Sequence, residues 1–348
     1  MKSKIVKILL YSTLAVSLFL IGLILIPRKY NVSQFEKRSD TQYWELHTGS
    51  TIGYQRLIGD STTNTTPIIY LHGGPGGRIT NETIELLKPL NHDIYLYDQI
   101  GSGHSERLKD ITEYTVDRHT KDLEAIIEVI QTPKVILMGQ SWGALLAMEY
   151  VAKHPDKVEK LIFTGPGPIL PFKTELTKIE SPDSLNLKSP QYSNAQGNQA
   201  AYNLRTKFLF YGAALFGKKM STDKEADNFF TYLNTQLNKS TKCDPADAKP
   251  SNGGGGYYVH VMTVRSFQEV KDKRAQVDGL EIPTLIIKGQ CDNQKWGFTQ
   301  EYLKLLPNSK LEIIEGAGHI IGKEHQEEYL QVVNAFLKNK TYVKESYY

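Results

Sequence analysis

The chain of 348 residues has only two cysteines, Cys243 and Cys291, which excludes a disulfide scaffold, a CxxC redox pair and a cysteine zinc cluster. It also lacks an excess of one charge: 41 Lys and Arg residues stand against 38 Asp and Glu residues. These charges are interspersed, whereas a nucleic-acid-binding protein shows a basic stripe. We therefore expect no nucleic-acid partner. We expect the cysteines to be ordinary buried thiols, with a disulfide as the alternative in an oxidising compartment.

One long apolar run is present, at residues 8–26, and it contains no charged residue. As a helix, it would be just long enough to cross a hydrocarbon core of about 30 Å. It ends in a poor cleavage site, so we predict an uncleaved signal anchor within residues 1–30. A cleaved signal peptide and a buried or interfacial helix are the alternatives. Lys2, Lys4 and Lys7 exceed the basic residues directly after the run, which predicts an extracytoplasmic domain. Export after signal cleavage is the alternative location.

Short apolar runs alternate with amphipathic stretches in the rest of the chain. The predicted strands are 42–47, 52–58, 68–71, 93–97, 134–138, 158–164, 283–288 and 310–314, and the predicted core helices are 115–131, 142–153, 298–306 and 324–337. This alternation predicts the α/β class, with a doubly wound, mainly parallel sheet and helices on both faces.

The alternation stops between about residues 165 and 279 and then resumes. We therefore predict an inserted, mostly helical cap at residues 166–280, with weak helical segments at 198–215 and 226–237. The core then has two parts, at residues 31–165 and 281–348.

The residues after the predicted strand 134–138 have the features of a nucleophile elbow. Gly139-Gln-Ser-Trp-Gly143 matches the pattern G-x-S-x-G, and a predicted helix starts directly after it. The glycines leave room for a sharp turn that exposes the serine oxygen, and the positive end of the helix is directed at that oxygen. We predict Ser141 as a catalytic nucleophile. A plain glycine-rich turn is the alternative.

A serine hydroxyl needs a base, and the base needs an acid that orients it. After such an elbow, the acid and then the histidine follow on later loops. Asp292 follows the strand 283–288, and His319 follows the strand 310–314. Both stand at carboxyl ends of strands, where a doubly wound sheet binds ligands. We predict Asp292 as the acid and His319 as the base. His325 is the weaker rival for the base, and a helix N-cap is the alternative role of Asp292.

A glycine-rich loop, His72-Gly-Gly-Pro-Gly-Gly77, follows the strand 68–71. An oxyanion hole takes one backbone donor from such a loop and one from the residue after the nucleophile. We predict the N–H groups of Gly74 and Trp142 as these donors, with a turn without a role as the alternative. His72 is predicted to fix the loop. The predicted site uses no metal and no cofactor.

These motifs, together with Asp98-Gln-Ile-Gly-Ser-Gly-His-Ser105, resemble the α/β-hydrolase family in its branch of proline iminopeptidases (prolyl aminopeptidases). The resemblance covers about residues 65–165 and 280–325. The loop at 72–76 and the run at 98–105 are the parts more particular to this branch. The resemblance implies an α/β-hydrolase fold and a metal-free serine peptidase that removes an amino-terminal residue, often proline, from short peptides.

Several departures from the branch concern the substrate. Position 100 is Ile where the branch commonly has Arg, and Ala144 stands where Gly or Ser is frequent. The branch holds the substrate's ammonium group with cap carboxylates, commonly in a Trp-rich segment, but this cap has no tryptophan. Six acidic cap residues are available, and spacing singles out none of them: Glu175, Glu180, Asp223, Glu225, Asp227 and Glu269.

The favoured function is an aminopeptidase that releases N-terminal proline or another small residue by acyl transfer. A carboxylesterase or lipase-like hydrolase of small esters is the first alternative. A non-catalytic ligand-binding protein on the same fold is the second. The expected partners are a small-molecule or short-peptide substrate and, through the N-terminal segment, a membrane.

Overall fold

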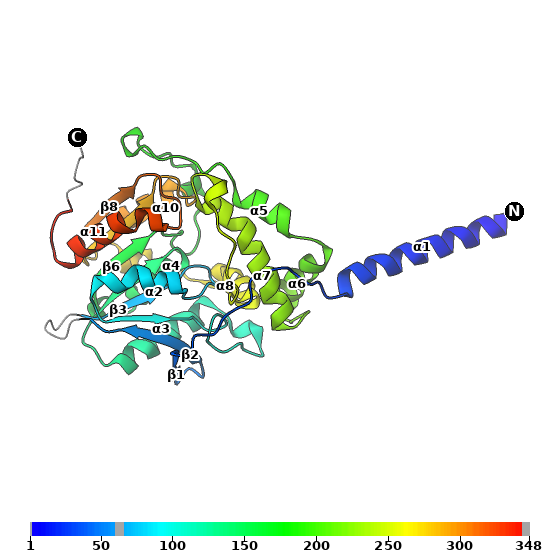
Figure 1. Ribbon diagram of the computed structural model, residues 1–348, viewed down its shortest axis with the longest axis horizontal. Helices are drawn as coiled ribbons and strands as arrows, with labels where there is room; N and C mark the ends of the chain where they lie inside the picture. Colours follow the sequence, from blue (N-terminus) through cyan, green and yellow to red (C-terminus); the bar gives the residue numbers. More distant parts are fainter. Residues whose placement is uncertain (1, 60–65, 343–348) are drawn as a thin grey trace.

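The computed structural model describes residues 2–59 and 66–342, and its centre is one eight-stranded sheet (Figure 1). The order across the sheet is β1-β2-β4-β3-β5-β6-β7-β8. β2 pairs antiparallel with β1 and with β4, and the pairs from β4 to β8 are parallel. The strands are β1 (Gln42–Glu45), β2 (Thr51–Leu57), β3 (Ile68–Leu71), β4 (Ile94–Tyr97), β5 (Val135–Gln140), β6 (Val158–Thr164), β7 (Thr284–Gly289) and β8 (Ser309–Ile314). The predicted α/β class with a mainly parallel sheet is confirmed.

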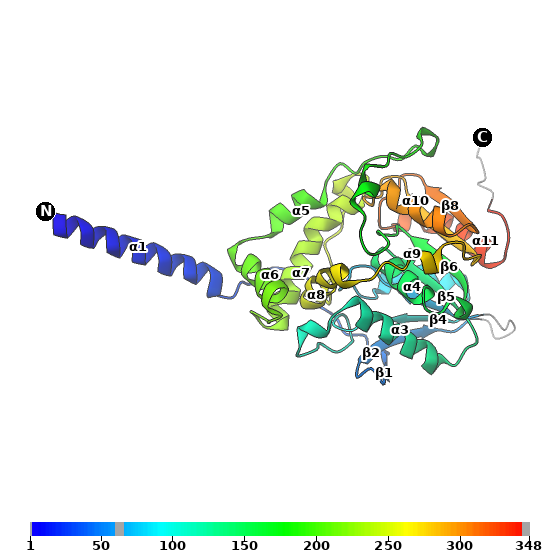
Figure 2. The ribbon, with the colours of Figure 1, turned by 180° about the vertical axis from the view of Figure 1, so that it is seen from behind.

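Helices cover both faces of this sheet (Figures 1 and 2). Neighbouring residues of one strand belong to different cores because strand side chains alternate between faces: Ile69 lies in one buried cluster and Ile68 in the other. The first cluster includes Leu123 and Leu146 from helices, and the second includes Val333. The helices of the first face are α3 (Val116–Ile130), α4 (Trp142–Val151) and α10 (Trp296–Leu305), and those of the second are α2 (Asn81–Leu87) and α11 (Gln326–Leu337).

A mostly helical cap lies between β6 and β7 in the chain. Its helices are α5 (Asn194–Ala201), α6 (Leu204–Phe216), α7 (Asp223–Leu237), α8 (Tyr257–Ser266) and α9 (Arg274–Val277). The cap packs on loops at the carboxyl ends of the strands: the Gly256 N–H donates to the Gly76 carbonyl over 2.9 Å, and a Cβ on Gly318 would lie 2.0 Å from the Thr241 carbonyl oxygen. The expected limits of the cap at 166–280 stay a prediction.

The cysteines form a disulfide, so the expectation of two free thiols is wrong. Cys243 belongs to the cap, and Cys291 follows β7. Their Cα atoms are 5.1 Å apart, within the range that a disulfide bridges. The two residues are 48 positions apart in the sequence, and only the folding of the cap over the β7 loop brings them together. The disulfide therefore fastens the cap to the loop that carries Asp292.

The first helix, α1 (Lys2–Leu25), projects away from the rest of the molecule at the cap (Figures 1 and 2). Within the described residues, it is the one helix long and apolar enough to cross a membrane. Its last turn touches the cap, where the Arg205 guanidinium donates to the Ile24 carbonyl over 3.0 Å. Further on, the Tyr30 ring packs between Phe229 and Tyr232. The segment that follows the apolar run is therefore built into the cap.

Candidate active site

Ser141 occupies a strained turn between β5 and α4, as the elbow pattern predicts. Its φ of 54° and ψ of −115° are unusual for a residue with a side chain. The two glycines of the pattern are required by space: a Cβ on Gly139 would lie 2.6 Å from the Ala144 nitrogen, and one on Gly143 would lie 2.0 Å from the Leu71 carbonyl oxygen. The turn places Ser141 at the N-terminal end of α4, where the helix dipole favours negative charge.

His319 and Asp292 form the buried pair that the sequence predicts. His319 Nδ1 lies 2.8 Å from Asp292 Oδ1. The carboxylate can only accept here, so Nδ1 carries the proton, and in this tautomer of the neutral imidazole the lone pair is on Nε2. Burial opposes the ionisation of Asp292, but His319 and Lys288 beside it lower its pKa to about 2. Asp292 is therefore ionised at neutral pH.

The contacts of Asp292 and the position of His325 bear on the alternatives for these two residues. Asp292 Oδ1 accepts from the Gln294 N–H over 2.9 Å, but the N-cap of α10 is Lys295. The Asp292 side chain therefore supports its own loop instead of capping the helix. His325 lies in a short 3₁₀ helix before α11, and it is His319 that Asp292 bonds.

Lys288 is a part of this site that the sequence interpretation missed. Its ammonium lies 3.0 Å from Asp292 Oδ2 and donates to the Gln294 carbonyl over 2.8 Å. Its side chain is 2% exposed, so the ion pair is shielded from water. A lysine at the end of a predicted strand would ordinarily be taken for a surface residue, because lysine is almost never fully buried unless paired.

The end of β6 brings the elbow and the histidine loop together. The Ser141 N–H donates to the Thr164 carbonyl over 3.0 Å. The next residue, Gly165, has a φ of +53°, and a Cβ there would lie 2.8 Å from His319 Nδ1. The two loops thus pack against consecutive residues, Thr164 and Gly165. Ser141 Oγ forms no hydrogen bond with any residue in the described ranges, and hydrogen bonds of catalytic groups often tighten only when substrate is bound.

The two predicted oxyanion donors lie on segments that one side chain connects. Gln99 donates from its amide nitrogen to the His72 carbonyl over 3.0 Å, and its amide oxygen accepts from the Trp142 indole over 2.7 Å. Gly74, in the loop after His72, has a φ of +134°, which disfavours any residue with a side chain. Gln99 therefore holds the glycine-rich loop and the start of α4 in one arrangement. The sequence offered Gln99 only as part of a motif.

The loop-fixing role expected of His72 agrees with its contacts. Its Nε2 accepts from the Gln99 N–H over 3.0 Å, so Nδ1 carries the proton and donates to the Gly73 carbonyl over 2.8 Å. Burial lowers the pKa of His72, and its neutral form suits both bonds. With both nitrogens engaged in the loop, His72 is not available as a base.

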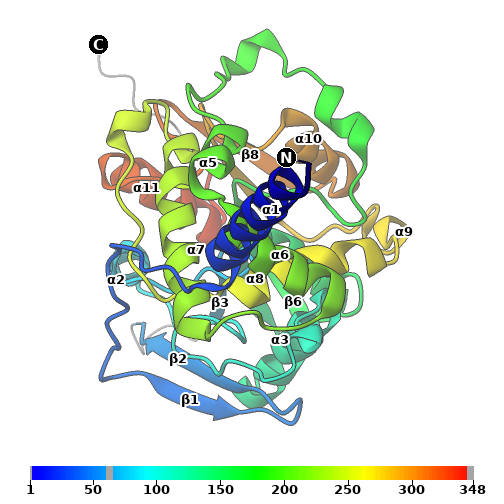
Figure 3. The same ribbon diagram turned by 90° about the vertical axis from the view of Figure 1, so that its right-hand side faces the viewer.

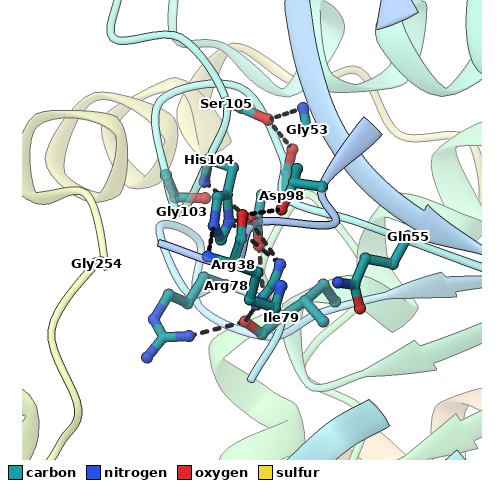
Figure 4. A network of polar contacts seen from close by, with 12 residues as sticks. Arg38, Gly53, Gln55, Arg78, Ile79, Asp98, Gly103, His104, Ser105 and Gly254 are labelled. Atoms are coloured by element: carbon teal, nitrogen blue, oxygen red, sulfur yellow. Dashed lines mark hydrogen bonds and ion pairs between the residues drawn. The ribbon is translucent and has the colours of Figure 1, made fainter. Parts of the chain in front are cut away.

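Asp98 forms the centre of a second buried network (Figure 4). It accepts from the Ile79 N–H over 2.7 Å and from the His104 backbone N–H over 2.8 Å. His104 Nδ1 also lies 2.9 Å from the carboxylate, and Arg38 lies 3.6 Å from it. Burial would raise the pKa of Asp98, but these partners keep it below its ordinary value. The run at 98–105 therefore positions the loops around Gln99.

The profile of the α/β-hydrolase fold family matches residues 66–326. The chain belongs to the α/β-hydrolase fold family. The match covers the elbow, the acid and the histidine as well as the cap. Membership in this family, together with the curated relatives below, confirms the expectation of a hydrolase.

Curated relatives of this α/β hydrolase include proline iminopeptidases. The protein of that name from Heyndrickxia coagulans is 29% identical over 303 residues, which cover 84% of this chain and 96% of the relative. The one from Saccharolobus solfataricus is 25% identical over 277 residues, covering 78% and 84%. The resemblance that the motifs indicate is therefore confirmed over most of the chain.

Solved structures show the same fold. A bromoperoxidase from Bacillus anthracis aligns with a TM-score of 0.56 and 22% identity, covering 86% of this chain and 100% of that structure. An esterase from Exiguobacterium antarcticum aligns with a TM-score of 0.56 and 18% identity, covering 85% and 99%. At these identities the likeness concerns the fold alone.

Proposed function

We propose that this protein is a serine hydrolase that acts by acyl transfer through Ser141, His319 and Asp292. His319 Nε2 accepts the Ser141 proton while Oγ attacks a carbonyl carbon, and the N–H groups of Gly74 and Trp142 stabilise the oxyanion. His319 then donates the proton to the leaving group, and water releases the acyl group in the same manner. The observation that carries this proposal is the buried 2.8 Å contact between His319 and Asp292, next to a strained elbow serine.

Within this class we propose an aminopeptidase that releases N-terminal proline or another small residue from short peptides. The similarity to proline iminopeptidases extends over most of the chain. The two motifs particular to that branch are also joined physically here. Asp98 anchors one of them, and Gln99 connects it to the glycine-rich loop.

A carboxylesterase of small esters is the second candidate, and the cap carboxylates favour it. Glu225 is paired with Arg205 at 2.7 Å, Asp227 with Arg107 at 3.1 Å, and Asp223 with a lysine. The other three acidic candidates are exposed: Glu175, Glu180 and Glu269. Thus three of the six carboxylates already have basic partners, and the rest are solvated. A substrate ammonium group would have to compete for each of them.

A substrate panel separates the two candidates. We expect proline naphthylamide to be cleaved with a higher kcat/KM than short-chain nitrophenyl esters. Much faster turnover of the esters would contradict the peptidase and support the esterase. Ser141→Ala should abolish both activities and labelling by a fluorophosphonate. If the wild-type protein is folded but neither labelled nor active, it is a non-catalytic binding protein on this fold.

We also propose that α1 anchors the protein in a membrane with the catalytic domain outside the cytoplasm. The length and hydropathy of α1 suit a span, and the lysines before its apolar run favour this orientation. The disulfide supports an oxidising compartment. The contact of Ile24 with the cap favours retention of the end of the apolar run over cleavage after it. The N-terminus of the mature protein from cells tests the anchor. A protein that begins at residue 18 or beyond would contradict it.

A further inference from the structure

Helix α6 of the cap is apolar on two opposite faces. Leu209 and Ala213 on one face are buried in the core. The other face, here called the α6 apolar face, follows a spacing of four, three and four residues and consists of Leu204, Phe208, Tyr211 and Leu215. Phe216, the last residue of the helix, lies about 100° further round the axis and is counted with this face because it is equally exposed. Leu215 and Phe216 are 68% and 69% exposed. A helix that is apolar all round is normally buried on all sides. Phe208 is half-buried against the core, but Leu204, Tyr211 and Leu215 are exposed, so most of the α6 apolar face lacks a cover among the described residues.

The contact between α1 and α6 determines how deep in a membrane the α6 apolar face would lie. Arg205, in the first turn of α6, donates to the Ile24 carbonyl. Ile24 lies two residues before the end of the apolar run, which is about 3 Å along the helix axis. An anchor that fills the hydrocarbon core with residues 8–26 therefore brings the start of α6 to the hydrocarbon boundary. Figure 3, a view along α1, shows α6 beside it.

The surroundings of the junction suit the polar part of a bilayer. Arg28 and Lys29 follow α1, and both are exposed, as are Lys207 and Lys218 of the α6 region. Arg28 and Lys29 also line a cavity of about 390 Å³ at the foot of α1, together with Tyr202. Lipid phosphates attract basic residues, and aromatic rings such as Tyr are enriched at the membrane interface.

We propose that the α6 apolar face is a membrane-docking surface, embedded in the interface of the same bilayer that α1 spans. This inference rests on the anchor proposed above. Leu215 and Phe216 enter the boundary between headgroups and acyl chains, and the basic residues contact the phosphates. α1 leaves the molecule beside this face, so the bilayer occupies the space that another partner would need. The cap is then attached to the membrane at two points, which fixes its orientation.

Tryptophan quenching by brominated lipid tests this directly. The full chain is reconstituted in vesicles of phosphatidylcholine and phosphatidylglycerol, with half of the phosphatidylcholine brominated near the glycerol end of its acyl chains. Phe216→Trp reports on the α6 apolar face, and Tyr43→Trp is the matched control, because Tyr43 is a 51% exposed aromatic residue on β1, away from α1. After subtraction of the parent signal, we expect the emission at 216 to fall at least twofold in brominated vesicles and that at 43 to stay unchanged.

The outcomes separate the docking from the anchor. Failure of the intact chain to float with the vesicles would overturn the anchor, and the docking with it. Flotation without quenching at 216 would overturn the docking alone. A blue-shifted but unquenched emission would mean that protein, such as a second copy, covers the face, and would overturn it as well. Leu215→Trp repeats the measurement at a second position, and retained hydrolase activity shows that each variant is folded.

Discussion

Lys288 and His319 bind the two different oxygens of the Asp292 carboxylate, at 3.0 Å and 2.8 Å. The acid therefore divides its negative charge between a lysine ammonium and the imidazole. This arrangement keeps Asp292 ionised to low pH. It also weakens the hold of Asp292 on the imidazolium that the proposed reaction forms.

Replacing Lys288 with methionine should change the pH dependence of catalysis. Without the ammonium, the whole carboxylate charge acts on His319. We expect the acid limb of the kcat/KM profile to move up by about one pH unit. Because a buried ion pair is broken, the free energy of unfolding should fall by about 3 kcal/mol. Stopped assays from pH 4 to 9 and denaturant unfolding measure the two effects.

Lys160→Met is the matched control for this change. Lys160 is also buried, at 6% exposure, but its ammonium donates to backbone carbonyls such as that of Leu337, at 2.8 Å. This variant should lose stability and keep the wild-type pH profile. An identical shift of the profile in both variants would show that Lys288 acts through stability alone.

Gln99→Met should slow the chemical step because it frees the two segments that carry the proposed oxyanion donors. The variant loses the bonds to the His72 carbonyl and to the Trp142 indole while keeping a similar volume. We expect kcat to fall by about tenfold to hundredfold, less than for loss of a whole donor, with little change in KM. Steady-state kinetics on the best substrate of the panel provide the measurement.

Two further variants test whether the effect is specific to Gln99. Trp142→Phe removes the indole N–H together with the pyrrole part of the ring, but it keeps the bond of Gln99 to the His72 carbonyl and should cost less than Gln99→Met. Gln55 is a buried glutamine on β2 that donates to Asp40 over 2.7 Å. The kcat of the Gln55→Met variant should stay close to that of the wild type. Equal losses in all three would contradict a specific role of Gln99.

The sheet was predictable because its strands are short apolar runs, and each predicted strand overlaps an observed one. Helix α8 was not predicted, because its start at Tyr257-Tyr-Val-His-Val261 is rich in strand-forming residues. In the structure, Tyr257, Val259 and Val261 are all buried, and packing overrides the local preference. The disulfide was mispredicted for a related reason, since only tertiary structure brings its two ends together.

The candidate site was predictable where chain order carries the information. The elbow, the acid and the histidine each follow a strand, so the sequence alone predicts that they meet at one edge of the sheet. Lys288 and Gln99 could not be assigned in this way. Their roles depend on which neighbour a side chain reaches, and no spacing rule encodes that. Gln99 lay in a recognised motif, which was the only available signal.

Acid should destabilise the protein partly through Asp98. A carboxyl group whose pKa is lowered on folding contributes stability above its unfolded pKa and loses that contribution as the pH falls. We expect the free energy of unfolding to decrease below about pH 4. Asp98→Asn should be less stable at pH 7 and show a shallower decrease. Denaturant unfolding at pH 3 to 7 compares the two, and parallel curves would contradict a contribution from this carboxyl group.

Reduction of the disulfide should loosen both the cap and the loop after β7 that carries Asp292. It closes a loop of 48 positions, and the chain-entropy relation gives a loss of about 4 kcal/mol when such a link is cut. Because Cys291 directly precedes Asp292, kcat should fall as well. Unfolding and activity are measured with and without dithiothreitol. The double variant Cys243→Ser/Cys291→Ser is the control: it should match the reduced wild type and be insensitive to the reductant. If the variant is instead as stable and active as the oxidised protein, the disulfide has no role in holding Asp292 in place. Noncovalent contacts such as the Lys288 ion pair then suffice.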